Sequence, residues 1–128
     1  MGVTGEAEAG FELQVDAATR LVQGRGWGFW DRPMAERFQR QLTETVRRVG
    51  RPSRLLLDVT ALLPQPDDAQ ETLRQLMAAS LGVGLTQAIL VTTNAITRLQ
   101  LTRLAREAKA PHWVLVADLA QAQRKLAP

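Results

Sequence analysis

Three aspartates, Asp58, Asp67 and Asp68, are the residues whose type and spacing best suit chemistry. Carboxylates that gather at the end of a strand can hold Mg²⁺ for phosphoryl transfer. Such a site usually draws acids from several strand ends, and the first two strands offer only Asp16 and Asp31 in suitable positions. Capping of a helix N-terminus also explains the adjacent pair. We therefore expect Asp67 or Asp68 to cap a helix, and we expect no metal to bind.

Other catalytic combinations find little support. The chain has no cysteine and a single histidine, His112, which excludes thiolate chemistry and leaves few ligands for zinc. A nucleophile with a general base would need this histidine beside Ser53 or Ser80. Ser53 flanks a proline in a turn and Ser80 lies within a helix, so neither has the setting of a nucleophile. We expect no catalytic residues, no cofactor and no enzymatic activity.

The acids belong to a stretch around which the rest of the chain is arranged. Residues 55–59 have the pattern of a strand buried on both faces, and a loop with two prolines precedes the next helix. Partners and ligands meet parallel sheets at such strand-to-helix loops, and residues 92–94 follow the next apolar strand in the same way. We predict a partner-binding surface here, with Leu62 or Leu63 exposed. Its residues are Leu62, Leu63, Asp67, Asp68, Thr92 and Asn94.

A second candidate site comes from three glycines at a spacing of two, Gly24, Gly26 and Gly28. In a strand they leave one face almost bare of side chains. Phe29 stands where a dinucleotide fingerprint would need its third glycine, which excludes a Rossmann site. Two interpretations stay open: a helix packs closely on the smooth face, or the face lines a ligand pocket with an arginine for an anionic group. The ligand-binding residues would then be Gly24, Gly26, Trp27, Arg37 and Arg40.

Apolar periodicity defines the elements that would position these residues. Two strands near residues 11–15 and 21–30 form an antiparallel hairpin, and further strands follow near residues 55–59, 88–91 and 112–117. Helices fill the intervals, each with one apolar stripe, and a short fourth helix ends the chain. The stripes are Met34, Phe38, Leu42, Val46 and Val49 in the first helix, Leu73, Leu76, Met77 and Leu81 in the second, and Ile96, Leu99, Leu104 and Ala108 in the third.

This element order predicts a single α/β domain over residues 11–127. We expect a mixed sheet of four to five strands, with an antiparallel first hairpin, parallel strands joined by right-handed helical crossovers, and about four helices. Residues 1–10 are small and polar and contain glycine, so we expect a flexible N-terminus.

Composition excludes several functional classes. A hydrophobic fraction of 45% with 23% charged residues is typical of a globular domain. The net charge of +3 comes from 16 basic and 13 acidic residues that are interleaved along the helices, so we expect no binding of nucleic acid. No apolar run approaches the ~20 residues that span a bilayer, and no export signal is visible. We expect no membrane span and a cytoplasmic location.

The order of strands and helices resembles the STAS domain, the fold of sporulation-type anti-sigma-factor antagonists and of SpoIIAA-like, lipid-binding-like bacterial proteins. The resemblance covers roughly residues 11–127, and Leu-Asp-Val-Thr-Ala-Leu at 57–62 looks like the family's buried strand and following turn. Regulatory members continue into a D-S-S-G helix start whose second serine is phosphorylated by a partner kinase. The matching residues here are Pro-Asp-Asp-Ala at 66–69, so Asp68 replaces that serine. It either mimics the phosphorylated state or only stabilises the helix start.

The resemblance implies a non-catalytic regulatory or protein-interaction module that lacks the phosphorylatable serine. The alternative is a carrier domain of the SpoIIAA-like type, which would take a small apolar or anionic ligand or a lipid. A protein partner is expected in the first case, and the chain could also form a homodimer. The sequence pattern leaves both functions open.

Overall fold

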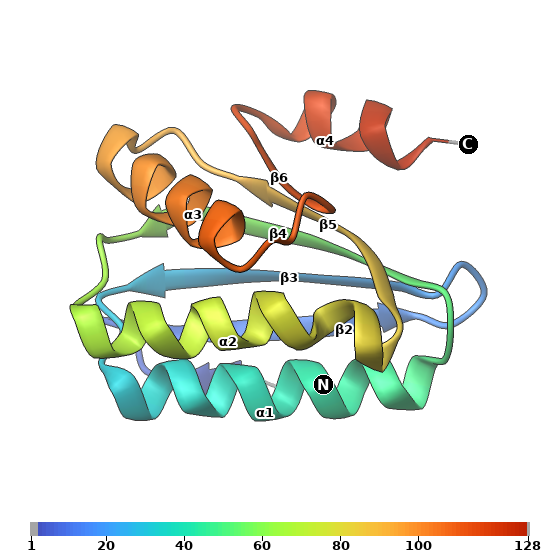
Figure 1. Cartoon of the computed structure of the whole chain (residues 1–128), viewed down its shortest axis with the longest axis horizontal. Coiled ribbons are helices and arrows are strands. Elements are labelled where there is room, and N and C mark those ends of the chain that lie inside the picture. The colour runs from blue at the N-terminus through green and yellow to red at the C-terminus, as the bar shows by residue number, and fades with distance from the viewer. Residues whose placement is uncertain (1–2, 128) are drawn as a thin grey trace.

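The computed structural model describes residues 3–127, which form a six-stranded sheet and four helices (Figure 1). The elements in chain order are β1 (Val3–Gly5), β2 (Gly10–Asp16), β3 (Leu21–Gly28), α1 (Arg32–Val49), β4 (Ser53–Leu62), α2 (Asp67–Val83), β5 (Leu85–Val91), α3 (Ala95–Glu107), β6 (Trp113–Val116) and α4 (Leu119–Leu126). No helix in this range has both the length and the apolar character needed to cross a bilayer.

The sheet follows the order of the chain, β1-β2-β3-β4-β5-β6. The pairs β1–β2 and β2–β3 are antiparallel, and the pairs from β3 to β6 are parallel. The predicted α/β class, antiparallel hairpin and four helices are therefore confirmed. The strand count differs from the four to five expected, because the segment expected to be flexible contributes β1. Its pairing with β2 places Val3 opposite Glu12 and Gly5 opposite Gly10.

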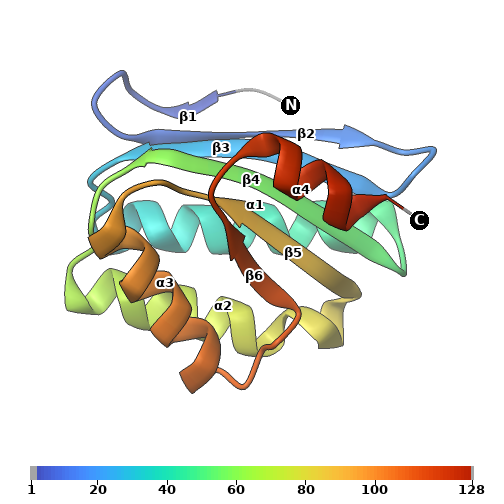
Figure 2. The same cartoon turned by 90° about the horizontal axis from the view of Figure 1, so that it is seen from above.

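Helices cover the two faces of the sheet unequally. Figure 1 shows α1 and α2 running side by side on one face, and Figure 2 shows α4 crossing the sheet on the side opposite α1. Successive side chains of β4 point to opposite faces of the sheet and so contribute to both cores. Leu55 and Leu57 join the large core under α1, α2 and α3. Leu56 points to the other face and packs with Ile89 and Ala122 beneath α4.

Helix α1 has the register that the sequence predicts. Asp31 caps its N-terminus by accepting a hydrogen bond from the Met34 backbone nitrogen at 3.0 Å, and Pro33 lies in the first turn. Phe38 and Leu42 are fully buried, as the stripe requires. The helix ends at Gly50, whose φ of 95° favours glycine.

Two predicted apolar stripes need correction. In α3, Ile96 and Leu99 face solvent with 61% and 70% of their surface exposed, whereas Thr97 and Leu101 are buried. Asn94 caps this helix through the Thr97 backbone nitrogen, and the buried stripe begins at that threonine. In α2, Leu81 is exposed, because the buried face consists of Leu73, Leu76, Met77 and Ser80.

Candidate functional site

The two loops predicted to form a common surface do meet at the carboxyl ends of β3, β4 and β5. The Leu63 backbone nitrogen donates to the Gly28 carbonyl at 3.0 Å, which joins the loop after β4 to the end of β3. The Thr97 hydroxyl donates to the Leu62 carbonyl at 3.0 Å, which joins the end of β4 to the first turn of α3. These two hydrogen bonds hold three chain segments together at the carboxyl ends of the parallel strands.

A glutamine network fixes the loop after β4. The Gln65 backbone nitrogen donates to Gln100 Oε1 at 2.8 Å, and Gln100 Nε2 donates back to the Gln65 carbonyl at 3.3 Å. Gln70 Nε2 donates to the same carbonyl at 2.8 Å and its Oε1 accepts from Arg103. Gln65 is itself buried and donates to the Leu63 carbonyl at 2.7 Å. Sequence reasoning missed this network, because glutamine spacing alone does not reveal a contact between two helices and a loop.

Four large apolar side chains are exposed on these segments, and we call them the strand-end surface: Phe29, Leu63, Ile96 and Leu99. Leu63 has 49% of its surface exposed and Phe29 has 53%. Phe29 and Leu63 directly follow β3 and β4, and Ile96 and Leu99 lie in the first two turns of α3, the helix that follows β5. The prediction of an exposed leucine holds for Leu63 only. Leu62 is 2% exposed, because β4 continues to it and turns its side chain into the core.

The paired acids lie beside this surface but do not cap α2. Pro66 occupies the N-cap position, where no side chain accepts a hydrogen bond, and Asp67 and Asp68 stand exposed in the first turn. The predicted capping box is therefore wrong for both acids. Glu71 bonds Arg74 instead, and this hydrogen bond lowers the pKa of the Glu71 carboxyl below its usual value. The two aspartates still favour the helix, since negative charge at its N-terminus complements the dipole.

Thr92 and Asn94 have structural roles in the loop after β5. Thr92 is buried, and its hydroxyl accepts from the Asn94 backbone nitrogen at 3.3 Å. The Asn94 carboxamide oxygen accepts from the Thr97 backbone nitrogen at 2.9 Å as the cap of α3. Of the six residues predicted to bind a partner, Leu63, Asp67 and Asp68 are exposed, Asn94 is partly exposed, and Leu62 and Thr92 are buried.

The three aspartates that could have formed a metal site do not gather. Asp58 lies on the sheet face away from the main core, where its carboxylate accepts from the backbone nitrogen and hydroxyl of Thr60 at 2.9 and 2.7 Å. In the sheet register it lies opposite Arg25, whose guanidinium pairs with Glu12. Within residues 3–127, no group of three or more acidic, histidine or cysteine side chains is placed to hold a metal ion.

The structure brings Ser80 and His112 together, which the sequence did not predict. Ser80 Oγ lies 2.7 Å from His112 Nε2, but the hydroxyl donates its proton to the Met77 carbonyl at 2.7 Å and accepts from Trp113 Nε1 at 2.9 Å. The histidine must then donate from Nε2. A nitrogen that already carries a proton cannot accept the serine proton, so His112 does not act as a base for Ser80. Ser80 is 1% exposed, so no substrate reaches it. Burial lowers the pKa of His112, and its Nδ1 is buried without a partner among the described residues.

The smooth glycine face is filled from within the chain. Trp30 covers Gly26, and its indole nitrogen donates to the carbonyls of Gly10 and Trp27 at 3.1 and 3.2 Å. The ring packs against Phe38 at a centroid distance of 5.0 Å with the two ring planes tilted by 46°. The Trp30 side chain and not a helix backbone therefore occupies the space that Gly26 leaves, while Gly24 and Gly28 lie against the backbone of Glu12 and of Glu8 and Ala9.

The residues predicted to bind a ligand do not converge. The Trp27 indole nitrogen donates to the Glu6 carbonyl at 2.8 Å, and Arg25 lies 4.4 Å from the centre of the Trp27 ring. Arg37 and Arg40 are exposed on α1, and Arg37 borders an open hollow with Glu8, Ala9 and Met34. The void between the helices and the sheet measures about 20 Å³, which holds no more than a water-sized group.

Comparison with known proteins supports the fold. No protein-family model matches the sequence, and no curated protein matches it. Among solved structures, the chain is similar to an uncharacterised protein of the DUF3478 family with a SpoIIAA-like fold from Shewanella loihica. The two are 15% identical and align with a TM-score of 0.69 over 97% of this chain and 99% of the other. The chain therefore has a SpoIIAA-like fold, as its resemblance to the STAS domain predicted.

Proposed function

We propose that this SpoIIAA-like domain is a non-catalytic regulatory module that binds a protein partner through the strand-end surface. The observation that supports this most directly is the exposure of Phe29, Leu63, Ile96 and Leu99 on segments that hydrogen bonds hold in place. Exposed apolar side chains on a preformed scaffold are typical of an interface core, because binding then costs little ordering of the chain.

The neighbouring acids define the kind of partner. Asp67 and Asp68 are exposed at the start of α2, and the loop that precedes them contributes Leu63. An apolar centre with carboxylates at one side suits a partner that presents an apolar patch flanked by lysine or arginine. In this proposal Asp68 supplies a permanent negative charge where the regulatory STAS domains carry a phosphorylatable serine, so binding does not depend on phosphorylation.

Affinity capture with matched variants tests the proposal. Wild-type chain on a resin should retain a specific protein from the source lysate, and Leu63→Ser with Leu99→Ser should abolish this. Val15→Ser with Leu119→Ser is the matched control, because these exposed apolar residues lie elsewhere on the molecule. Asp67→Lys with Asp68→Lys should weaken capture about tenfold or more through charge reversal. Retention of the same protein by the Leu63/Leu99 variant would contradict the proposal.

The same variants distinguish a second copy of the chain from another protein. Light scattering on the purified wild type gives its mass in solution. If the strand-end surface binds a second copy, the wild type is a dimer that Leu63→Ser with Leu99→Ser converts to a monomer. A monomeric wild type that still captures a partner identifies a different protein as the occupant.

A further inference from the structure

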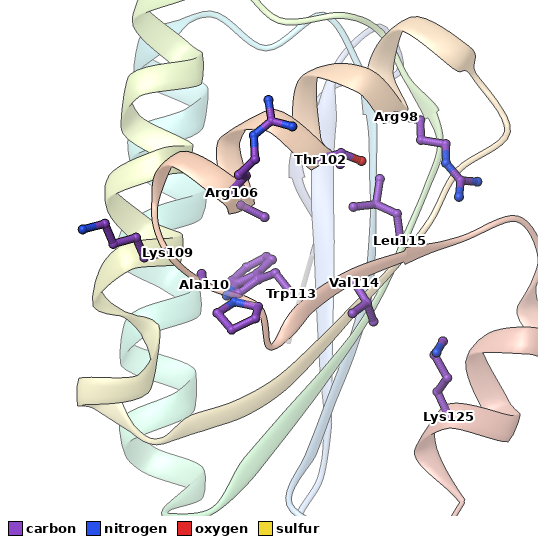
Figure 3. A pocket seen from close by; sticks show the side chains of 11 residues that line it. Arg98, Thr102, Arg106, Lys109, Ala110, Trp113, Val114, Leu115 and Lys125 are labelled. Atoms are coloured by element: carbon purple, nitrogen blue, oxygen red, sulfur yellow. The ribbon is translucent and has the colours of Figure 1, made fainter.

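A groove runs along the free edge of β6, the last strand of the sheet. It has a volume of about 630 Å³ and lies between α3 and α4 (Figure 3). Its apolar part consists of Val114 and Leu115, both half-buried, with Trp113 and Ala105 beneath them. Because β6 is the last strand of the sheet, one side of its backbone has no strand partner.

The register of β6 shows which backbone groups are open. The carbonyls of His112 and Val116 accept from β5, so these residues and Val114 direct their backbone groups toward the sheet. Trp113 and Leu115 direct theirs to the open edge. The Trp113 nitrogen is already bonded to the Ala110 carbonyl at 3.1 Å.

The outward nitrogen at the other end of β6 is also occupied, since the Ala117 nitrogen donates to Gln121 Oε1 at 3.1 Å. The open edge therefore presents one donor, the Leu115 N–H, between the outward carbonyls of Trp113 and Leu115. This is the pattern that one added strand would complete.

The walls of the groove are cationic. Arg98 and Arg106 come from α3 and Lys125 from α4, and in Figure 3 Arg98 and Lys125 stand on either side of Leu115 and Val114. Lys109 lies at the end of the groove, where its side chain extends away. No acidic residue lines the groove, and within residues 3–127 Arg98, Arg106 and Lys125 form no ion pair.

We infer that the β6 groove binds an extended acidic peptide segment of a partner protein, which adds to the sheet as a strand beside β6. Hydrogen bonds to the open backbone groups of β6 position the peptide. Side chains of alternate peptide residues point to the same side, so acidic residues at every second position face either Arg98 and Arg106 of α3 or Lys125 of α4. The same cations repel basic segments and so oppose unselective pairing at this edge. This surface shares no residue with the strand-end surface, and the two adjoin at Arg98, which lies between Ile96 and Leu99 in α3.

Fluorescence anisotropy with the full chain tests the inference. The probe is a fluorescein-labelled peptide, Glu-Val-Glu-Val-Glu-Val-Glu, and its match is Glu-Val-Glu-Pro-Pro-Glu-Glu, which has the same charge but whose adjacent prolines remove an N–H from each edge of the strand. The first should bind, and the proline peptide should bind at least about tenfold more weakly. Arg98→Glu with Lys125→Glu should also weaken binding about tenfold or more. Arg47→Glu with Arg124→Glu, exposed basic residues outside the groove, should leave it unchanged.

Amide hydrogen exchange gives an independent readout. The Leu115 amide should exchange more slowly in the complex, because the peptide carbonyl occupies its N–H. Equal binding of both peptides, or displacement of the probe by about 1 mM inorganic phosphate, would show a simple anion site and overturn the inference. Absence of binding by the Glu-Val peptide at about 1 mM would overturn it as well.

Discussion

The indole of Trp30 occupies the space that a side chain on Gly26 would require. A Cβ atom on Gly26 would lie 2.8 Å from Cζ2 and 3.3 Å from Cη2 of the ring. Trp30 cannot move aside easily, because it is 1% exposed and packs against both Phe11 and Phe38. The glycine is therefore a packing requirement of the core and not an opening for a ligand.

Gly26→Ala should destabilise the domain by about 1–3 kcal/mol, since the methyl group overpacks a filled core. Gly82→Ala in α2 is the control, because a Cβ at Gly82 meets no atom within 4 Å. That change should stabilise the helix by about 0.4–1 kcal/mol. Urea unfolding followed by circular dichroism measures both. Equal stability of Gly26→Ala and wild type would show that the indole shifts at no cost.

Removal of the Gln100 side chain should loosen the strand-end surface. Gln100→Ala deletes both hydrogen bonds to the Gln65 backbone and should cost about 1–2 kcal/mol. Exchange of the Gln65 amide should accelerate more than that of the β4 core amides, because the loop opens locally. Gln123→Ala, an exposed change on α4, should alter neither quantity. An unchanged Gln65 amide would show that Gln70 alone holds the loop.

Stability should fall at acidic pH through His112. Burial lowers its pKa in the folded state, so the unfolded chain binds the proton more readily. The free energy of unfolding should hold steady above about pH 6.5 and decrease as the pH falls below it toward the folded pKa. Protonation would also place a donor on Nδ1, which is buried without a partner in the described range.

His112→Gln provides the matched variant, because its Nε2 can still donate to Ser80 while the side chain no longer titrates. Urea unfolding at about pH 7.5 and pH 5.5 should show a smaller difference for the variant than for the wild type. The same difference in both proteins would place the acid sensitivity on other groups.

The sequence predicted those features that depend on local patterning. Alternation in β2 and β4 and the stripe of α1 follow from the periodicity of apolar residues, and they fix the sheet and its crossovers. The predicted buried face of α3 was wrong, because Ile96 and Leu99 fit a helical stripe as well as Thr97 and Leu101 do. Tertiary packing selected the stripe that begins with a threonine, whose hydroxyl reaches the Leu62 carbonyl.

The candidate site was predictable in position but not in detail. Polar loops after β4 and β5 indicate a binding surface at the carboxyl ends of the parallel strands, and the strand-end surface lies there. Two of its members, Ile96 and Leu99, were assigned to the core by their hydrophobicity. The contact between Ser80 and His112 joins α2 to the start of β6, and no local pattern reports a pairing over that separation.

Helix caps offer a last comparison between pattern and geometry. Asp31 caps α1 with a carboxylate that accepts from the Met34 nitrogen, whereas Asp67 stands in the first turn of α2 without a capping bond. Asp31→Ala should therefore cost about 1 kcal/mol, because it leaves a helix donor without its partner. Asp67→Ala should cost only about 0.3–0.5 kcal/mol, the value of a screened charge near a dipole. Urea unfolding at low and high salt separates the two, since the Asp67 effect should fade as salt rises while most of the Asp31 effect, a direct hydrogen bond, should remain. A larger loss for Asp67→Ala than for Asp31→Ala would mean that Asp67 caps α2 in solution after all.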